Sequence, residues 1–179
     1  MIVAARSFSP LIGSTAHTLI LGSMPGQASL KAEQYYAHPR NAFWPIMLAI
    51  IDNKPPCLES VKQLSYEQRC AKLIESGYAV WDVLAQCNRP GSLDSRIVRH
   101  SEIPNDIASL VNHYPELATI ACNGRMAEKL FRRHSRSTEA MSVFEHNRFR
   151  VCSLPSSSPA MASLTLDRKH QLWAEGLLG

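Results

Sequence analysis

Cysteine is sparse and scattered in this chain, so we expect neither a metal cluster nor a disulfide framework, and a four-cysteine cluster assembled from distant loops is the alternative that stays open. The five cysteines are an odd number and form no Cys-x-x-Cys pair, which argues against a zinc ribbon, an iron–sulfur site and paired disulfides. They stand at Cys57, Cys70, Cys87, Cys122 and Cys152. The histidines show no His-x-x-x-His or His-x-His spacing, so the sequence predicts no metal site.

Long apolar segments and common cofactor signatures are missing as well. No apolar run approaches the roughly 18–20 residues of a membrane-spanning helix, and the opening MIVAARSFSP has no apolar core like that of a secretory signal. The chain carries no Walker loop, no Gly-x-Gly-x-x-Gly and no Gly-x-Ser-x-Gly elbow. We therefore expect a cytoplasmic, monomeric protein with no membrane, metal or cofactor partner.

What the chain does have is enough apolar content for one core. It contains 179 residues, of which 45% are hydrophobic, and this predicts a single domain over residues 1–179. The net charge of +4 is mildly basic, and a basic surplus lies between Arg125 and Arg150. A basic face suits a polyanion such as DNA, but an ordinary solvated helix face has the same charge, so charge alone does not separate the two.

Apolar runs alternate along the chain with segments of helical periodicity. The runs that predict buried strands are HTLILG (17–22), YAVWDVL (78–84), LATIAC (117–122) and FRVCSL (149–154). The segments that predict helices are 42–51, 65–76, 104–114, 124–134 and 166–178. Ser65 with Gln68 resembles a capping box.

Strand–helix alternation predicts an α/β fold, a three-layer α/β/α sandwich around a central, mainly parallel four-stranded sheet. Right-handed crossovers place all the strand carboxyl ends at one edge of such a sheet, where ligands bind. The loops after the first and fourth strands, GSMPG (22–26) and LPSSSPAMA (154–162), should therefore meet at this edge.

Each of these loops has a functional and a structural interpretation. In GSMPG, Gly22 and Gly26 permit close backbone approach, although a plain turn has the same composition. The three serines of LPSSSPAMA can hydrogen-bond phosphates, although they also suit the start of a helix. The segment QYYAHPRNAFWPI adds Asn41 beside Phe43, and an amide next to an aromatic ring suits a flat heterocycle.

Together these segments resemble the uracil-DNA glycosylase superfamily. The resemblance is carried by LGSMPGQASL, YYAHPRNAFW, WDVLAQCNRPGSLDSRI, IACNGRMAEKLF and LPSSSPAMA, in that order. The Asn-x-Phe-Trp element makes the chain most similar to the hypoxanthine-DNA (deoxyinosine) branch and to mismatch-specific uracil/thymine-DNA glycosylases. The resemblance implies a monofunctional DNA glycosylase of base excision repair, which flips a deaminated base such as hypoxanthine or uracil out of DNA and hydrolyses its N-glycosidic bond.

The same resemblance implies roles for particular residues. Many members carry Asp or Asn where this chain has Met24, and in the deoxyinosine branch the catalytic role passes to the asparagine that corresponds to Asn41. We expect the base to contact Phe43, Gly22, Ser23, Gly26, Tyr36 and Asp82. We expect DNA phosphates to contact Ser156, Ser157 and Ser158.

Several alternatives remain open at this point. Asp82 suits a structural cap as well as a base contact, Asn123 is expected to hold backbone, and Met161 or Pro159 is a candidate wedge into the base stack. Because a thioether cannot polarise water, Met24 also leaves open a non-catalytic nucleic-acid-binding protein. A third possibility is an unrelated α/β small-molecule hydrolase that binds phosphate through its seryl loop.

Overall fold

The four runs predicted as strands form one parallel sheet. The computed structural model of the protein describes residues 4–135 and 149–179. In chain order the elements are β1 (Ala4–Arg6), β2 (Thr18–Gly22), α1 (Gln27–Ala32), α2 (Phe43–Asp52), α3 (Leu58–Lys62), α4 (Tyr66–Glu75), β3 (Tyr78–Asp82), β4 (Leu84–Asn88), the 3-10 turn η1 (Asp94–Arg96), β5 (Ile103–Pro104), α5 (Ile107–His113), β6 (Thr119–Asn123), α6 (Arg125–His134), β7 (Arg150–Leu154) and α8 (Leu166–Leu178). The sheet has the strand order β3-β2-β6-β7, with every neighbouring pair parallel. The predicted fold class is confirmed.

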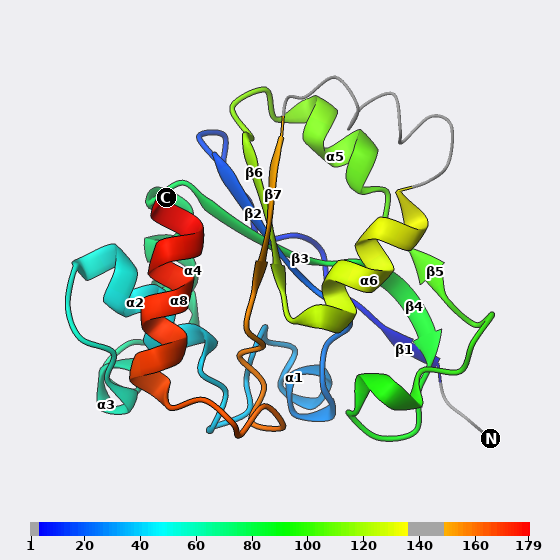
Figure 1. Ribbon diagram of the computed structural model, residues 1–179, viewed down its shortest axis with the longest axis horizontal. Helices are drawn as coiled ribbons and strands as arrows, with labels where there is room; N and C mark the ends of the chain where they lie inside the picture. The colour runs from blue at the N-terminus through cyan, green and yellow to red at the C-terminus, as the bar shows by residue number, and fades with distance from the viewer. Residues whose placement is uncertain (1–3, 136–148) are drawn as a thin grey trace.

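The sheet is covered by helices on both faces, which explains why its central strands are continuous apolar runs. Successive side chains of a strand point to opposite faces. Leu19 and Leu21 of β2 pack in the core formed with α5 and α6, whereas Ile20 between them packs in the core formed with α2, α4 and α8. Figure 1 shows α5 and α6 on one side of the sheet and α2, α4 and α8 on the other.

A second, antiparallel sheet was not predicted. It has the order β1-β4-β5, and β4 begins only one residue after β3 ends, inside the run predicted as a single strand over 78–84. At Val83 the chain leaves the first sheet, and its backbone N–H donates to the carbonyl of Gly22 at 2.8 Å. Because the apolar character continues through this change of sheet, hydrophobicity alone gives no sign of it.

Helix ends follow the local sequence with one correction. The capping box of Ser65 and Gln68 is present in both directions. The helix expected from residue 104 begins instead at Ile107, because Ile103–Pro104 pairs with β4 as β5. Asp106 then caps α5 by accepting a hydrogen bond from the Ser109 N–H at 2.9 Å.

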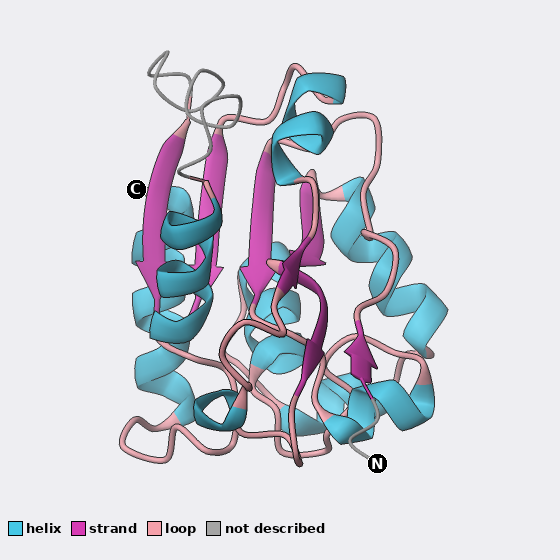
Figure 2. Ribbon diagram, turned by 90° about the vertical axis from the view of Figure 1, so that its right-hand side faces the viewer, coloured by secondary structure: helices cyan, strands magenta, loops and turns pink. Residues whose placement is uncertain are grey.

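All four parallel strands end at the same edge of the sheet, the lower one in Figure 1. The loops and short helix α1 that follow the strands gather there, and Figure 2 shows the strand arrowheads converging on these loops. In the part of the chain that the structure describes, no helix has the length and apolar character needed to cross a membrane.

Candidate active site

A cavity of about 450 Å³ opens at the carboxyl edge of the parallel sheet. Gly22 of β2, Asp82 of β3 and Asn123 of β6 line the cavity directly. The segment 156–160, which follows β7 in the chain, lines it as well. The volume lies within the range of about 300–1,000 Å³ that is usual for small-molecule sites. The parallel topology has therefore brought four distant parts of the sequence into one pocket that can hold a flat heterocycle.

Glycine at position 22 lets two polar side chains meet at the floor of this cavity. A Cβ on Gly22 would lie 2.5 Å from Oδ1 of Asp82 and 3.2 Å from Oη of Tyr36. The first distance is too short for any side chain, so only glycine allows the carboxyl group to lie against the strand. Gly26 is not needed for the same reason. A Cβ added at Gly26 would lie 3.6 Å from Ser92 Oγ, which is an ordinary contact distance.

These two side chains present hydrogen-bonding groups that the protein does not satisfy. Oδ2 of Asp82 and Oη of Tyr36 are both buried, and neither makes a well-formed hydrogen bond to a described residue, although the Asn123 side chain lies close to the Tyr36 hydroxyl. Burial and, to a smaller extent, the Asp94 carboxylate together raise the pKa of Asp82 to about 8, against the opposing effect of the Arg89 guanidinium. Burial likewise raises the pKa of Tyr36. At neutral pH both groups are therefore predominantly protonated. A buried polar atom without a protein partner calls for an explanation, and in a cavity a bound ligand or water supplies one.

A buried arginine holds the first loop in shape. Arg89 donates hydrogen bonds from its guanidinium to the backbone carbonyls of Met24, at 3.4 Å, and of Pro25. Its Nη1 also pairs with Oδ1 of Asp94 at 3.0 Å. The other oxygen of Asp94 accepts a hydrogen bond from Ser23 Oγ at 2.5 Å. The loop after β2 and the segment after β4 are thus joined by one charged network on the wall of the cavity.

Asn41 lines the cavity and hydrogen-bonds the start of a helix at the same time. Its Oδ1 accepts a hydrogen bond from the backbone N–H of Phe43 at 2.9 Å, in the first turn of α2. This bond fixes the orientation of the carboxamide, whose Nδ2 makes no hydrogen bond to the described residues. The next residue, Ala42, donates its N–H to the carbonyl of Ser157 at 2.9 Å, so Asn41 is held beside the seryl loop.

Phe43 does not reach the cavity, although the sequence predicted that it stacks on a base. Its side chain is fully buried in the core. The ring of Tyr36 lies stacked against it, with 3.9 Å between ring centroids and 18° between ring planes. Tyr36 adopts a left-handed backbone conformation with φ of 56°, and it is Tyr36 that lines the cavity. The aromatic surface in the cavity therefore comes from Tyr36, supported by Phe43, and from Tyr35, which also lines it.

The three serines of the seryl loop have different roles. Ser157 is 1% exposed; its N–H donates to Oδ1 of Asn123 at 2.9 Å, and its Oγ accepts from Nδ2 of Asn123 at 2.9 Å. Ser157 therefore has a structural role, and Asn123 holds its backbone as expected. Ser157 also lines the cavity, so its phosphate contact stays a prediction. The hydroxyl oxygens of Ser156 and Ser158 accept from nearby backbone N–H groups at 3.2 Å, which leaves both hydroxyl hydrogens available to a ligand. Both residues line the cavity.

The comparisons with known proteins agree with this geometry. The profile of the Uracil DNA glycosylase superfamily matches residues 10–175. The chain belongs to this superfamily. Glycosylases of the superfamily hydrolyse N-glycosidic bonds in DNA, so the resemblance noted in the sequence is confirmed, and the alternative of an unrelated small-molecule hydrolase is wrong.

Individual relatives of the glycosylase cover most of its length. A protein named Hypoxanthine DNA glycosylase from Methanosarcina acetivorans is 31% identical over 169 residues, which are 93% of this chain and 94% of that one. A protein of the same name from Methanosarcina barkeri is 33% identical over 120 residues, 67% of this chain and 71% of its own. The solution NMR structure of a protein from M. acetivorans, provisionally described as a uracil DNA glycosylase, superposes with a TM-score of 0.75 at 28% identity and covers 97% of this chain and 96% of its own.

Most predicted site residues of the glycosylase converge on the cavity, and several unpredicted ones join them. Pro159 and His38 also line it, whereas Met161, the other candidate wedge, is not among the lining residues. Sequence reasoning assigned no role to Arg89 or Asp94, although both lie within the segment that carries the resemblance. In the sequence Arg89 stands directly before Pro-Gly and Asp94 three residues after it, a pattern that gives no clear sign of either role.

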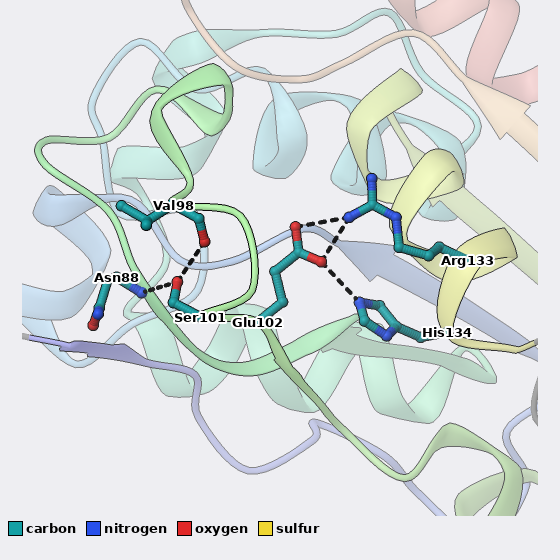
Figure 3. A network of polar contacts seen from close by, with 6 residues as sticks. All are labelled: Asn88, Val98, Ser101, Glu102, Arg133 and His134. Carbon is teal, nitrogen blue, oxygen red and sulfur yellow. Dashed lines mark hydrogen bonds and ion pairs between the residues drawn. The ribbon is translucent and has the colours of Figure 1, made fainter.

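The segment that contributes Asp94 to the glycosylase cavity is also anchored at its far end. Glu102 accepts two hydrogen bonds from Nη1 of Arg133, at 2.8 and 2.6 Å, and lies 3.2 Å from Nε2 of His134. Ser101 accepts from the Asn88 backbone N–H at 2.9 Å, and Figure 3 shows this network between the segment and α6. The segment is thus fixed to the core on both sides of the cavity-lining residues.

Groups that would hold a metal ion are not found in the described part of the glycosylase. Over residues 4–135 and 149–179, no three or more His, Cys, Asp or Glu side chains are arranged for metal binding. The cavity is lined by amide, hydroxyl and carboxyl groups together with the basic side chains of His38 and Arg40, and such groups bind organic ligands through hydrogen bonds.

Proposed function

We propose that this chain is a monofunctional DNA glycosylase of base excision repair whose substrate base is hypoxanthine. The observation that carries the proposal is the pair of unpartnered polar groups, Asp82 and Tyr36, at the floor of a base-sized cavity. A ligand with a polar edge would satisfy both groups. The six-membered ring and imidazole of hypoxanthine present O6 and N7 as acceptors and N1–H as a donor. The names of the two Methanosarcina relatives support the same base.

The nucleotide must leave the helix to reach this cavity. Flipping costs a few kcal/mol and is easiest at a mismatched pair, which is the situation of hypoxanthine opposite thymine. The ring of Tyr36, supported from behind by Phe43, provides the aromatic contact for the flipped base. The hydroxyl groups of Ser156 and Ser158 contact the flanking phosphates without requiring a counter-charge.

Asn41 orients the attacking water in this proposal. An amide has no useful pKa and cannot act as a general base. Its Oδ1, already held by the Phe43 N–H, has a second lone pair that can accept a hydrogen from water, and its Nδ2 can donate. Cleavage proceeds through a transition state with oxocarbenium character, so positioning is sufficient and strong base catalysis is not required. Loss of one such preorganised contact reduces a rate by roughly 10²–10³-fold.

The chemistry stops at the abasic site. A lyase step would require an amine nucleophile near C1′, and no lysine is among the described residues that line the cavity. Lys169 lies beneath the seryl loop, where its Nζ donates to the carbonyl of Ser158 at 3.4 Å. This contact supports the loop and keeps the amine directed at the backbone.

The test is excision from labelled duplexes that carry one hypoxanthine, uracil, xanthine or mismatched thymine. We expect alkali-labile sites at hypoxanthine. The yield of such sites at uracil is then compared with the yield at hypoxanthine. Binding to all duplexes at low salt with no cleavage of any would favour the alternative, a non-catalytic nucleic-acid-binding member of the superfamily.

Variants at position 41 separate chemistry from folding. Asn41→Ala removes the amide and also the hydrogen bond to the Phe43 N–H, which contributes about 1 kcal/mol, whereas Asn41→Ser keeps an oxygen that can accept this bond. Both should lose roughly 10²–10³-fold in single-turnover rate while DNA binding persists. Asn112→Ala, an exposed asparagine on α5, is the matched control and should cleave like the unchanged protein.

A further inference from the structure

The carboxyl group of Asp82 has no structural task that would explain its burial. It lies at the carboxyl end of β3, 3% exposed, and it lines the cavity. Its Oδ2 has no hydrogen-bond partner in the described part of the chain, and Gly22 provides the space that it occupies. A structural cap would show a bonded backbone N–H at this oxygen, so the carboxyl group is directed to a ligand.

The surroundings of Asp82 keep its proton in place until a ligand arrives. The charged groups that face it are the Asp94 carboxylate and the Arg89 guanidinium, which act in opposite directions. Arg89 is already neutralised by Asp94 at 3.0 Å. The hydroxyls of Tyr35 and Tyr36, on the segment between α1 and α2, interact electrostatically with Asp82. They stay neutral because burial raises the pKa of each. With burial dominating, the pKa of Asp82 is about 8.

We propose that the protonated carboxyl group of Asp82 is the general acid of the reaction and delivers its proton to N7 of the flipped purine. This inference rests on the proposed function. As the bond between C1′ and N9 breaks, its electron pair moves into the ring, the O–H bond of Asp82 breaks and an N7–H bond forms. Hypoxanthine leaves as a neutral base and Asp82 becomes a carboxylate.

The protons balance over one turnover. The water that adds to C1′ loses a proton to solvent, and Asp82 regains a proton from solvent once the base has left. The burial that raises the pKa of Asp82 also makes its carboxylate unfavourable, so reprotonation is favoured at neutral pH. Uracil has no N7, so this device acts only on purine leaving groups.

The proposal is tested by single-turnover excision of hypoxanthine as a function of pH, between about pH 6 and pH 10. The unchanged protein should show a constant rate at low pH and a tenfold fall per pH unit above about pH 8. Asp82→Asn cannot transfer a proton; it should lose roughly 10²–10⁴-fold in rate and should show no alkaline fall. Asp167→Asn, which removes an exposed carboxylate in the first turn of α8, is the matched control.

A binding measurement separates loss of the acid from loss of the fold. The unchanged protein and Asp82→Asn can both donate a hydrogen bond to N7, so both should bind a deoxyinosine duplex several-fold more tightly than one with 7-deazahypoxanthine, roughly 5–10-fold for one hydrogen bond. Asp82→Ala should bind the two duplexes equally.

The outcomes distinguish this proposal from the proposed function. If Asp82→Asn excises hypoxanthine at the rate and with the pH profile of the unchanged protein, the acid role is overturned while hypoxanthine excision stands. If the unchanged protein binds both duplexes equally, contact with N7 is overturned. If it excises no hypoxanthine at any pH, both proposals fail.

Discussion

Arg89→Met is the substitution that best tests how the first loop of the cavity is held. The methionine fills a similar volume but donates no hydrogen bond. The arginine side chain is 1% exposed and its partner Asp94 is 33% exposed, so Asp94 regains water when the pair is broken. The main loss falls on the carbonyls of Met24 and Pro25, two buried residues that would be left without their charged donor.

The expected loss follows from these contacts. A buried carbonyl left without its partner costs about 1–3 kcal/mol, and the exposed end of the ion pair contributes little. Arg89→Met should therefore lower the free energy of unfolding by about 2–4 kcal/mol, out of a total of about 5–15 kcal/mol.

Urea unfolding followed by circular dichroism measures this loss. The slope of the free energy of unfolding against urea concentration should be the same for the variant and the unchanged protein. Arg96→Met, an exposed arginine in the turn η1 of the same segment, is the control and should shift stability by less than about 0.5 kcal/mol. If both variants unfold like the unchanged protein, the charged network does not hold the loop and the reasoning is refuted.

Three further predictions concern the floor and wall of the cavity. Gly22→Ala should displace the Asp82 carboxyl, since the added Cβ would lie 2.5 Å from Oδ1. The free energy of unfolding should fall by about 1–3 kcal/mol, and a single-turnover assay should show a strong drop in hypoxanthine excision. Ser157→Ala should cost about 1–3 kcal/mol in a urea melt because the buried amide of Asn123 loses its acceptor, whereas Ser158→Ala should leave stability unchanged and weaken DNA binding. Because the folded pKa of Asp82 is raised to about 8, its contribution to stability is fully present below the unfolded value near 3.8 and is lost as pH rises towards 8. Relative to the unchanged protein, Asp82→Asn should therefore gain stability steadily over this range. If thermal melts show the same difference in melting temperature between the two proteins at every pH, the raised pKa is contradicted.

The sequence was sufficient to predict the sheet and the position of the site. The two central parallel strands are buried on both faces and appear as uninterrupted apolar runs, whereas the edge strand β7 is mostly exposed. The two unusual loops follow the first and last of the four strands. Parallel topology then requires these loops to meet at one edge, which is where Gly22 and Ser156 line the cavity.

Details of side-chain orientation were beyond the sequence. Nothing in the order of residues distinguishes the buried Phe43 from the cavity-lining Tyr36, because the difference arises from the positive φ of Tyr36. In the sequence Arg89 is indistinguishable from an exposed loop arginine. Only the folded chain shows that its guanidinium is buried against the backbone carbonyls of Met24 and Pro25. The apolar run through Val83 likewise concealed the change from one sheet to the other.

Release of free hypoxanthine from a deoxyinosine duplex, detected by mass spectrometry under single-turnover conditions, tests the central assignment most directly. The unchanged protein and Asn112→Ala should release the base at equal rates, and Asn41→Ala should release it roughly 10²–10³-fold more slowly at equal DNA occupancy. Equal release by Asn41→Ala, or no release by the unchanged protein when fully bound, would contradict the account.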